Sequence, residues 1–303
     1  MVTALLPVFA LILLGMWLSR QGFPGSSFWP QVERLTYYLL FPALLVGKLA
    51  TADTSAVELG NVALLVAGFL VLGTLVLVVL QRCLGWEGAR FTSVYQGGIR
   101  FNTYVALAVV SQLLGDSGLA VAAVAIAIMI PSINLLCIAA FALYGDGEKP
   151  SLIAVLKQIL TNPLIVACLV GIAWNTLVLP WPQAFGLFMQ LLGQTALPLG
   201  LLAVGAGIQL SALRGASSAF VWSCVVKLLL LPLIILLLCQ LSGVDGLTRD
   251  VLIILGAMPT ASSAYILARQ LGGDAPLMAA IISGQTLLAI LSMPLLLGWL
   301  VST

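Results

Sequence analysis

Two polar stretches interrupt an otherwise apolar chain, and they carry the side chains best suited to bind a ligand. The first, Ser93 to Tyr104, reads SVYQGGIRFNTY and has Gly, Tyr or a polar residue at nine of its twelve positions. The second, Gly256 to Tyr265, reads GAMPTASSAY and contains Pro259, which interrupts a helix. The guanidinium of Arg100 and the hydroxyls of the second stretch are hydrogen-bond donors that could hold a small anion. These hydroxyls belong to Thr260, Ser262 and Ser263.

The composition indicates that these residues are positioned by a bundle of membrane helices. Of 303 residues, 62% are apolar and 7% are charged, whereas a soluble domain carries roughly 25% charged residues. A net charge of +2 is too small to neutralise a nucleic-acid backbone, so a nucleic-acid partner is excluded. The chain has no histidine, the commonest metal ligand and general base. We therefore expect an all-α polytopic protein in contact with the lipid bilayer, with no metal, cofactor or catalytic site.

Ten apolar segments are long enough to cross a bilayer, which takes about 20 residues of helix. They lie near residues 2–19, 31–50, 58–81, 92–113, 117–143, 152–175, 184–209, 217–241, 249–270 and 275–301. Helix is expected throughout, because a backbone in lipid must satisfy its own hydrogen bonds. No charged residue precedes Arg20, so the first segment is expected to be a retained helix and not a cleaved signal peptide.

The cationic residues predict how these helices are oriented. Links after odd-numbered segments hold eight Lys or Arg residues, and links after even-numbered segments hold two. Because cytoplasmic loops are enriched in Lys and Arg, both termini are expected outside. The membrane is expected to be the plasma membrane, which is the inner membrane in a bacterium.

A constant spacing indicates an internal duplication, although apolar sequences also resemble one another in general. The pairs spaced by 156 are Pro7 and Pro163, Gly15 and Gly171, Pro24 and Pro180, and Pro42 and Pro198. Pairs spaced by 158 include Gly85 and Gly243, Gly98 and Gly256, and Gly115 and Gly273. We predict a first five-helix repeat over 1–144, a short cytoplasmic link over 145–151 and a second repeat over 152–303. Five is an odd number, so the second repeat would be inverted, as in many secondary transporters.

The two polar stretches occupy corresponding positions, since the 158 spacing aligns Phe101 with Pro259 and Asn102 with Thr260. They would break helices 4 and 9, and the half-helix N-termini would carry partial positive charge at mid-membrane. No Asp or Glu is expected in the core of a span, so an anionic substrate is the expected counter-charge for Arg100. The alternative is that Arg100 satisfies backbone carbonyls of the opposite break.

Five segments resemble the auxin efflux carrier family, which includes plant auxin exporters and bacterial permeases of small carboxylates. In chain order they are LLPVFALILLGMWLSRQGF, LLFPALL, RFNTYVALAV, NPLIVACLVGI and MPTASSAYILARQLGGD. The resemblance covers essentially the whole chain and implies the fold of the bile-acid sodium symporters, in which helices 4 and 9 cross. It implies a scaffold of helices 1, 2, 6 and 7, an elevator-type transport domain of helices 3–5 and 8–10, and a homodimer through the scaffold.

The same resemblance maps a substrate site onto both crossings. Its residues are Asn102, Thr103 and Tyr104 in the first crossing and Pro259, Thr260 and Ser262 in the second. Arg100 and Ser263 complete the candidate substrate-binding set. Phe101 stands where plant relatives are expected to carry proline, so the resemblance does not extend to the plant substrate geometry.

The preferred hypothesis is a secondary carrier that exports small organic anions such as carboxylates or auxin-like acids. An inside-negative potential contributes about 2.3 kcal/mol per charge and 100 mV, so export needs no coupled ion. The alternatives are a sodium-coupled symporter of a larger amphipathic anion and import by proton symport. An intramembrane enzyme or a structural subunit is disfavoured, because the sequence lacks His, a catalytic carboxylate pair and a reactive Cys setting.

Overall fold

The computed structural model describes residues 2–52, 59–145, 157, 160–215 and 217–300, and within these ranges it contains helices and no β-strand. The first repeat predicted above contains α1 (Val2–Arg20), α2 (Phe28–Leu35), the π-helix η1 (Thr36–Leu40), α3 (Phe41–Ala50), α4 (Leu59–Leu84), α5 (Gly88–Ile99) and α6 (Thr103–Tyr144). The remainder contains α8 (Pro163–Thr176), α9 (Gln183–Ala206), the 3-10 helix η2 (Leu210–Gly215), α10 (Ser218–Val225), the π-helix η3 (Val226–Leu230), α11 (Leu231–Ser242), α12 (Gly246–Ala257), α13 (Ser263–Gln270) and α14 (Ala275–Leu300). Apart from Gly145, the predicted link over 145–151 lies outside the described residues.

Six helical segments of the described chain are long and apolar enough to cross a membrane. They are Thr3–Arg20, Leu59–Leu84, Gly88–Tyr144, Gln183–Ala206, Ser218–Ser242 and Ala275–Leu300. These segments make the chain an all-helical, multi-pass membrane protein, as its composition predicts.

Two helical segments are discontinuous: Gly88–Tyr144, which is one of these six, and α12–α13, which is not among them. The first is interrupted after α5 and turns again inside α6, where Gly115 adopts a φ of 62° that glycine tolerates and other residues rarely adopt. The second is interrupted between α12 and α13. The bounds of α12 lie 158 positions after those of α5, from 88 to 246 and from 99 to 257, which is the spacing found in the sequence.

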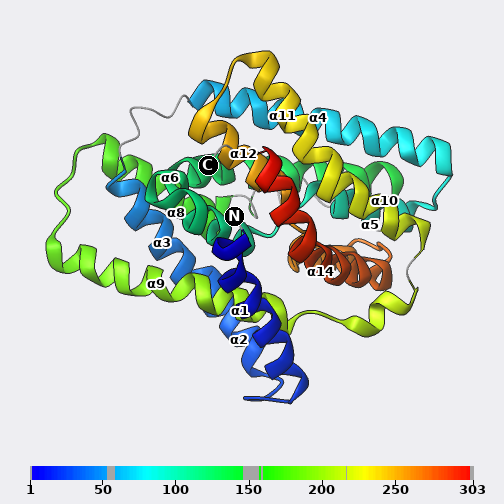
Figure 1. Ribbon diagram of the computed structural model, residues 1–303, viewed down its shortest axis with the longest axis horizontal. Helices are drawn as coiled ribbons and strands as arrows, with labels where there is room; N and C mark the ends of the chain where they lie inside the picture. Colours follow the sequence, from blue (N-terminus) through cyan, green and yellow to red (C-terminus); the bar gives the residue numbers. More distant parts are fainter. Residues whose placement is uncertain (1, 53–58, 146–156, 158–159, 216, 301–303) are drawn as a thin grey trace.

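The helices pack as two groups, which lie on opposite sides of Figure 1. In one group α1 packs on α9, and α3 packs on α8 and α9. A Cβ at Gly15 of α1 would overlap the backbone of Leu202 in α9, so the absence of a side chain lets these helices approach closely, as is common in membranes. In the other group α4, α5, α10, α11, α12 and α14 pack on one another, and α6 contacts helices of both groups.

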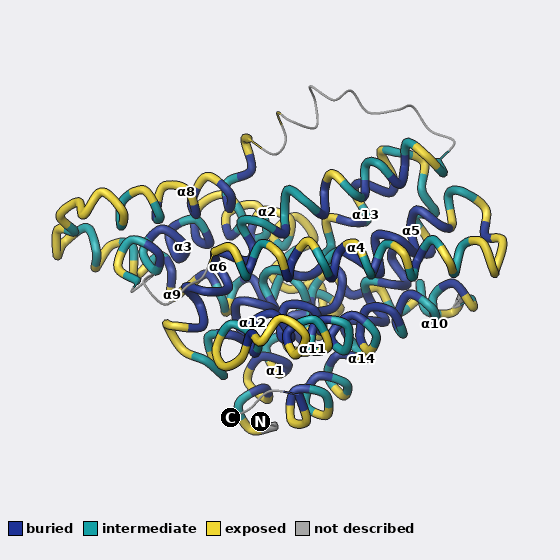
Figure 2. Tube along the Cα trace, turned by 90° about the horizontal axis from the view of Figure 1, so that it is seen from above, coloured by how far each residue is buried: buried dark blue, intermediate teal, exposed yellow. Residues whose placement is uncertain are grey.

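Apolar side chains cover the outside of the molecule as well as its interior. The buried part of the trace is concentrated at the centre, and exposed residues lie at the periphery (Figure 2). On α4 the exposed residues Leu64, Val71, Leu75 and Val79 recur at helical spacing and form one face. Such a face is suited to contact with lipid chains and not with water.

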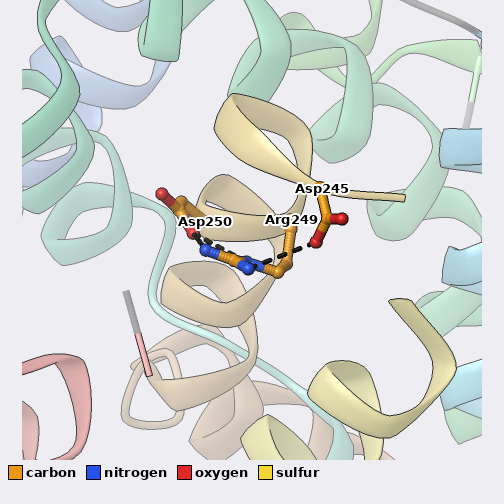
Figure 3. A network of polar contacts seen from close by, with 3 residues as sticks. All are labelled: Asp245, Arg249 and Asp250. Atoms are coloured by element: carbon orange, nitrogen blue, oxygen red, sulfur yellow. Dashed lines mark hydrogen bonds and ion pairs between the residues drawn. The ribbon is translucent and has the colours of Figure 1, made fainter. Parts of the chain in front are cut away.

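One arginine forms ion pairs with two carboxylates at the beginning of α12 (Figure 3). Arg249 donates from Nε and Nη2 to Oδ1 of Asp250, at 3.0 and 2.9 Å, and from Nη1 to Oδ1 of Asp245 at 3.2 Å. The Asp250 side chain is 5% exposed, whereas the Asp245 side chain is 78% exposed. The two ion pairs therefore differ chiefly in their distance from solvent.

We expect Asp250→Asn to destabilise the protein by about 3 kcal/mol, because it removes the charge of a buried carboxylate that pairs with Arg249. Asp245→Asn is the matched control, since it removes an exposed partner of the same arginine and is expected to cost about 0–1 kcal/mol. The thermal unfolding midpoints of the two variants in detergent measure the difference. Equal shifts of both midpoints would show that burial does not govern this network.

Candidate functional site

The two helix breaks contact each other directly. The backbone N–H of Asn102 donates to the carbonyl oxygen of Pro259 at 2.7 Å. The Thr260 hydroxyl donates to the carbonyl oxygen of Gly97 at 2.7 Å, near the end of α5. A broken helix leaves backbone groups without partners, and here each break supplies partners for the other. The structure thus brings the two polar stretches of the sequence together.

A glutamine from α14 completes this crossing. Gln285 is fully buried, and its Nε2 donates to the carbonyl oxygens of Gly97 at 3.0 Å and Ser223 at 3.1 Å. Its Oε1 accepts from the backbone N–H of Thr260 at 3.0 Å. Sequence reasoning missed Gln285, although a lone amide inside an apolar membrane helix was an available signal.

Two asparagines cap helices that point at the crossing. Oδ1 of Asn102 accepts from the backbone N–H groups of Tyr104 at 3.0 Å and Val105 at 3.2 Å, which makes it the N-cap of α6. Asn162 caps α8 in the same way, followed by Pro163 at the first helical position. Asn162 was also missed from the sequence, although asparagine followed by proline is typical of a helix N-terminus.

A cavity of about 560 Å³ lies beside the crossing, and we call it the Arg100 cavity. Three helix N-termini reach it, those of α6, α8 and α13, so partial positive charge converges there. Six of the eight predicted site residues line it: Arg100, Asn102, Thr103, Tyr104, Ser262 and Ser263. The other two, Pro259 and Thr260, are buried in the crossing itself and do not line the cavity.

Some of the guanidinium N–H groups of Arg100 lack a hydrogen-bond partner in the described part of the chain. Its Nη2 donates to the Ser263 hydroxyl at a long 3.4 Å, and its Nη1 is buried with no hydrogen-bond partner among the described residues. The alternative, that the guanidinium satisfies carbonyls of the opposite break, has no hydrogen bond in its support in the described part of the chain. The Pro259 carbonyl is instead occupied by the N–H of Asn102. A buried donor without an acceptor is costly, and an arriving anion would supply the acceptor.

A carboxylate that the sequence did not lead us to expect also lines the Arg100 cavity. Oε1 of Glu33 accepts a hydrogen bond from the Ser262 hydroxyl at 2.7 Å. The expectation that no Asp or Glu lies in the core of a span did not anticipate a carboxylate at this cavity. Glu33 lies near the predicted end of a span, but the N-terminus of α13 approaches α2 at this level.

A second, larger cavity of about 960 Å³ lies along the other end of the α2–α3 helix. It is lined by Lys48 of α3 and Asp116 of α6, whose Nζ and Oδ1 atoms are 2.6 Å apart. The lysine is thus already paired with a carboxylate, whereas Arg100 lacks an ion pair within the described residues. This difference favours the Arg100 cavity as the anion site.

A bundle of apolar helices with two discontinuous helices around a positively charged cavity is the architecture of a membrane transporter. The sequence profile of the family described as "Membrane transport protein" matches residues 1–297, so the chain belongs to this family. The resemblance to the auxin efflux carriers is thereby confirmed.

Two relatives carry transporter names. An "Uncharacterized transporter" of Methanothermobacter thermautotrophicus (strain Delta H) is 24% identical over 297 residues, which cover 96% of this chain and 95% of the relative. A "Putative malonate transporter" of Rhizobium meliloti (strain 1021) is 26% identical over 131 residues, which cover 42% of this chain and 41% of the relative. Family and relatives alike indicate a transporter and not an enzyme.

Proposed function

We propose that the protein is a secondary transporter of small organic anions, such as malonate-like carboxylates or auxin-like acids, across the plasma membrane. The observation that carries the proposal is the buried, unpartnered Nη1 of Arg100 at a cavity reached by three helix N-termini. The malonate named for one relative is a small carboxylate of the class proposed as substrate. Export follows from the inside-negative potential, which drives anions outward.

The proposed substrate contacts follow from the free donors around the cavity. Arg100 and Ser263 would hold one carboxylate. The Oδ1 of Asn102 is occupied in capping α6, so its Nδ2 amide is the group left to donate to the substrate. Thr103 and Tyr104 would line the pocket beside it, and Tyr104 is held by stacking on Phe41. We assign Pro259 and Thr260 the role of positioning the crossing, because they lie behind the cavity.

We also propose that the fold is a pair of inverted five-helix repeats, over 1–144 and 152–303 with the link over 145–151 between them. The matching bounds of α5 and α12 and the turn at Gly115 support it. The ten spans would be α1, α2–α3, α4, α5 with the first part of α6, the rest of α6, α8, α9, α10–α11, α12–α13 and α14. The scaffold would comprise α1, α2–α3, α8 and α9, and the other helices would move as an elevator. A homodimer through the scaffold and both termini outside belong to the same proposal.

The alternative of proton-coupled symport has one observation in its favour, the carboxylate of Glu33 in the cavity. The sodium-coupled alternative has no comparable support among the described residues. Coupling can be tested by experiment, because a pH gradient drives transport only when a proton moves together with the anion.

We expect purified protein in liposomes loaded with radiolabelled malonate to release it faster when an inside-negative potassium diffusion potential is imposed. The controls are malonate-loaded liposomes without protein, and liposomes with protein that are loaded with neutral malonamide. We also expect malonate at about 100 times its Kd to stabilise the protein by about 2.7 kcal/mol, observed as a higher unfolding temperature. The proposal would be refuted if malonate release were no faster than from liposomes without protein and if no small carboxylate stabilised the protein.

A further inference from the structure

The Glu33 carboxylate lies at the N-terminus of α13, in the cavity proposed to hold an anionic substrate. Its Oε1 accepts from the hydroxyl of Ser262, the N-cap residue of that helix, at 2.7 Å. Ser262 makes no capping bond to its own helix, so its hydroxyl is directed to Glu33 instead. A carboxylate at a helix N-terminus is stabilised by the partial positive charge there. The protein thus places one of its own carboxylates in the cavity assigned to a substrate carboxylate.

The charges around the Arg100 cavity leave room for one negative charge only. Its described lining contains two cations, Arg34 and Arg100, and one anion, Glu33. With Glu33 ionised, the net charge of these three side chains is +1, which the single negative charge of a monocarboxylate would neutralise. A dicarboxylate would bring two negative charges into a partly dehydrated space beside a third, where like charges repel strongly. Protonation of Glu33 would remove one of these three negative charges.

We propose that Glu33 couples dicarboxylate binding to the uptake of one proton. The inference rests on the proposed function of the Arg100 cavity. When a dicarboxylate enters, the Glu33 carboxylate binds a proton from solvent and releases the hydroxyl of Ser262, which then donates to the substrate. A monocarboxylate binds to the same cavity without a proton. The number of protons bound therefore follows the number of substrate charges.

Glu33 is the only carboxylate in the described lining of the Arg100 cavity. The helix α9, which packs on α2, has no titratable side chain between Gln183 and Ala206. The other titratable groups lining the cavity are Arg34 of α2, Tyr37 and Tyr38 of η1, Arg100 at the first break and Tyr104 of α6. Tyr265 and Arg269 of α13 do not line it. Arginine and tyrosine change protonation only at high pH, so Glu33 is the group of the described lining to which the proposal assigns the proton, and the Glu33→Gln variant separates it from the substrate's own carboxylates.

The Glu33–Ser262 contact also joins the two helix groups that are proposed to move. Glu33 belongs to α2, which contacts α9 in the proposed scaffold, and Ser262 begins α13, which contacts α5 and α14. A dicarboxylate that displaces Glu33 from Ser262 would break this contact at the moment of binding. Substrate binding would then also remove a contact between the proposed scaffold and the helices that are proposed to move.

The test is isothermal titration calorimetry of the purified full-length protein at about pH 7, where carboxylic acids in water are ionised. Titrations in two buffers of different ionisation enthalpy give the number of protons taken up. We expect malonate to bind the wild type with proton uptake, and its monoamide malonamate to bind without it. Glu33→Gln keeps the size and a hydrogen-bond acceptor but removes the charge. It is expected to lower the Kd of malonate about tenfold and to abolish the proton uptake.

Glu87→Gln is the matched control, because Glu87 is exposed at the beginning of α5 and does not line the cavity. It should bind malonate with the affinity and proton uptake of the wild type. Equal proton uptake by the wild type and Glu33→Gln would overturn the inference and leave the proposed function standing. A wild type that binds neither ligand would instead refute the proposed function. Should Glu33→Gln not fold, equal proton uptake for malonate and malonamate in the wild type would overturn the inference.

Discussion

Replacement of Arg100 by glutamine is expected to reduce carboxylate transport about a hundredfold. The guanidinium is the cation at the crossing, its Nη1 is buried without a partner in the described chain, and Nη2 reaches only the hydroxyl of Ser263. A substrate carboxylate would therefore gain a charge-assisted hydrogen bond from the cation beside the crossing. Losing one partner of a desolvated charge pair costs about 2–5 kcal/mol, and 2.7 kcal/mol corresponds to about a hundredfold.

The measurement is the initial rate of labelled malonate exchange in proteoliposomes with equal amounts of folded protein. Arg100→Lys should recover part of the rate, because it restores the charge without the planar fork of donors. Arg90→Gln is the matched control, since Arg90 is exposed on α5 and does not line the cavity. Exchange by Arg100→Gln at the wild-type rate would remove Arg100 from the site.

Replacement of Gln285 by leucine is expected to destabilise the protein by about 1–3 kcal/mol. The substitution fits by volume but removes partners from the N–H of Thr260 and from the carbonyls of Gly97 and Ser223. The Thr260 N–H is left without a partner, which costs about 1–3 kcal/mol, whereas the two carbonyls keep the Thr260 hydroxyl and the Val226 N–H as donors. Because Thr260 and Gly97 hold the two breaks together, transport should fall with stability.

Thermal unfolding in detergent measures this effect, and Gln240→Leu is the control, because Gln240 is exposed near the end of α11. The control is expected to change the unfolding temperature little. A loss of stability no larger for Gln285→Leu than for Gln240→Leu would mean that the amide does not hold the crossing.

The contact between the two breaks was predictable because it depends on local signals. Arg100, Asn102 and Pro259 mark polar or helix-breaking positions inside apolar sequence, and the 158 spacing aligns the two stretches that contain them without any knowledge of the fold. The first stretch is less disrupted than predicted, since α5 remains helical to Ile99. At Gly97 a Cβ would overlap side chains of Ser223 and Ile281, so this glycine serves close helix packing and not helix breaking.

The role of Glu33 was not predictable, because it depends on where two distant segments meet. Its partner Ser262 lies 229 positions away, and neither residue belongs to a repeated pair. The sequence also could not show that Thr260 turns into the crossing while Ser262 faces the cavity. These orientations depend on the angle at which α13 leaves the break, and the pattern of residue types does not encode that angle.

The most direct test of the central claim is to locate a bound carboxylate. Crystals grown with bromomalonate would show its position by anomalous scattering from bromine. We predict a bromine peak in the Arg100 cavity, with a carboxylate within hydrogen-bonding distance of Arg100 and Ser263. A peak in the cavity lined by Lys48 and Asp116, with the Arg100 cavity empty, would contradict the account.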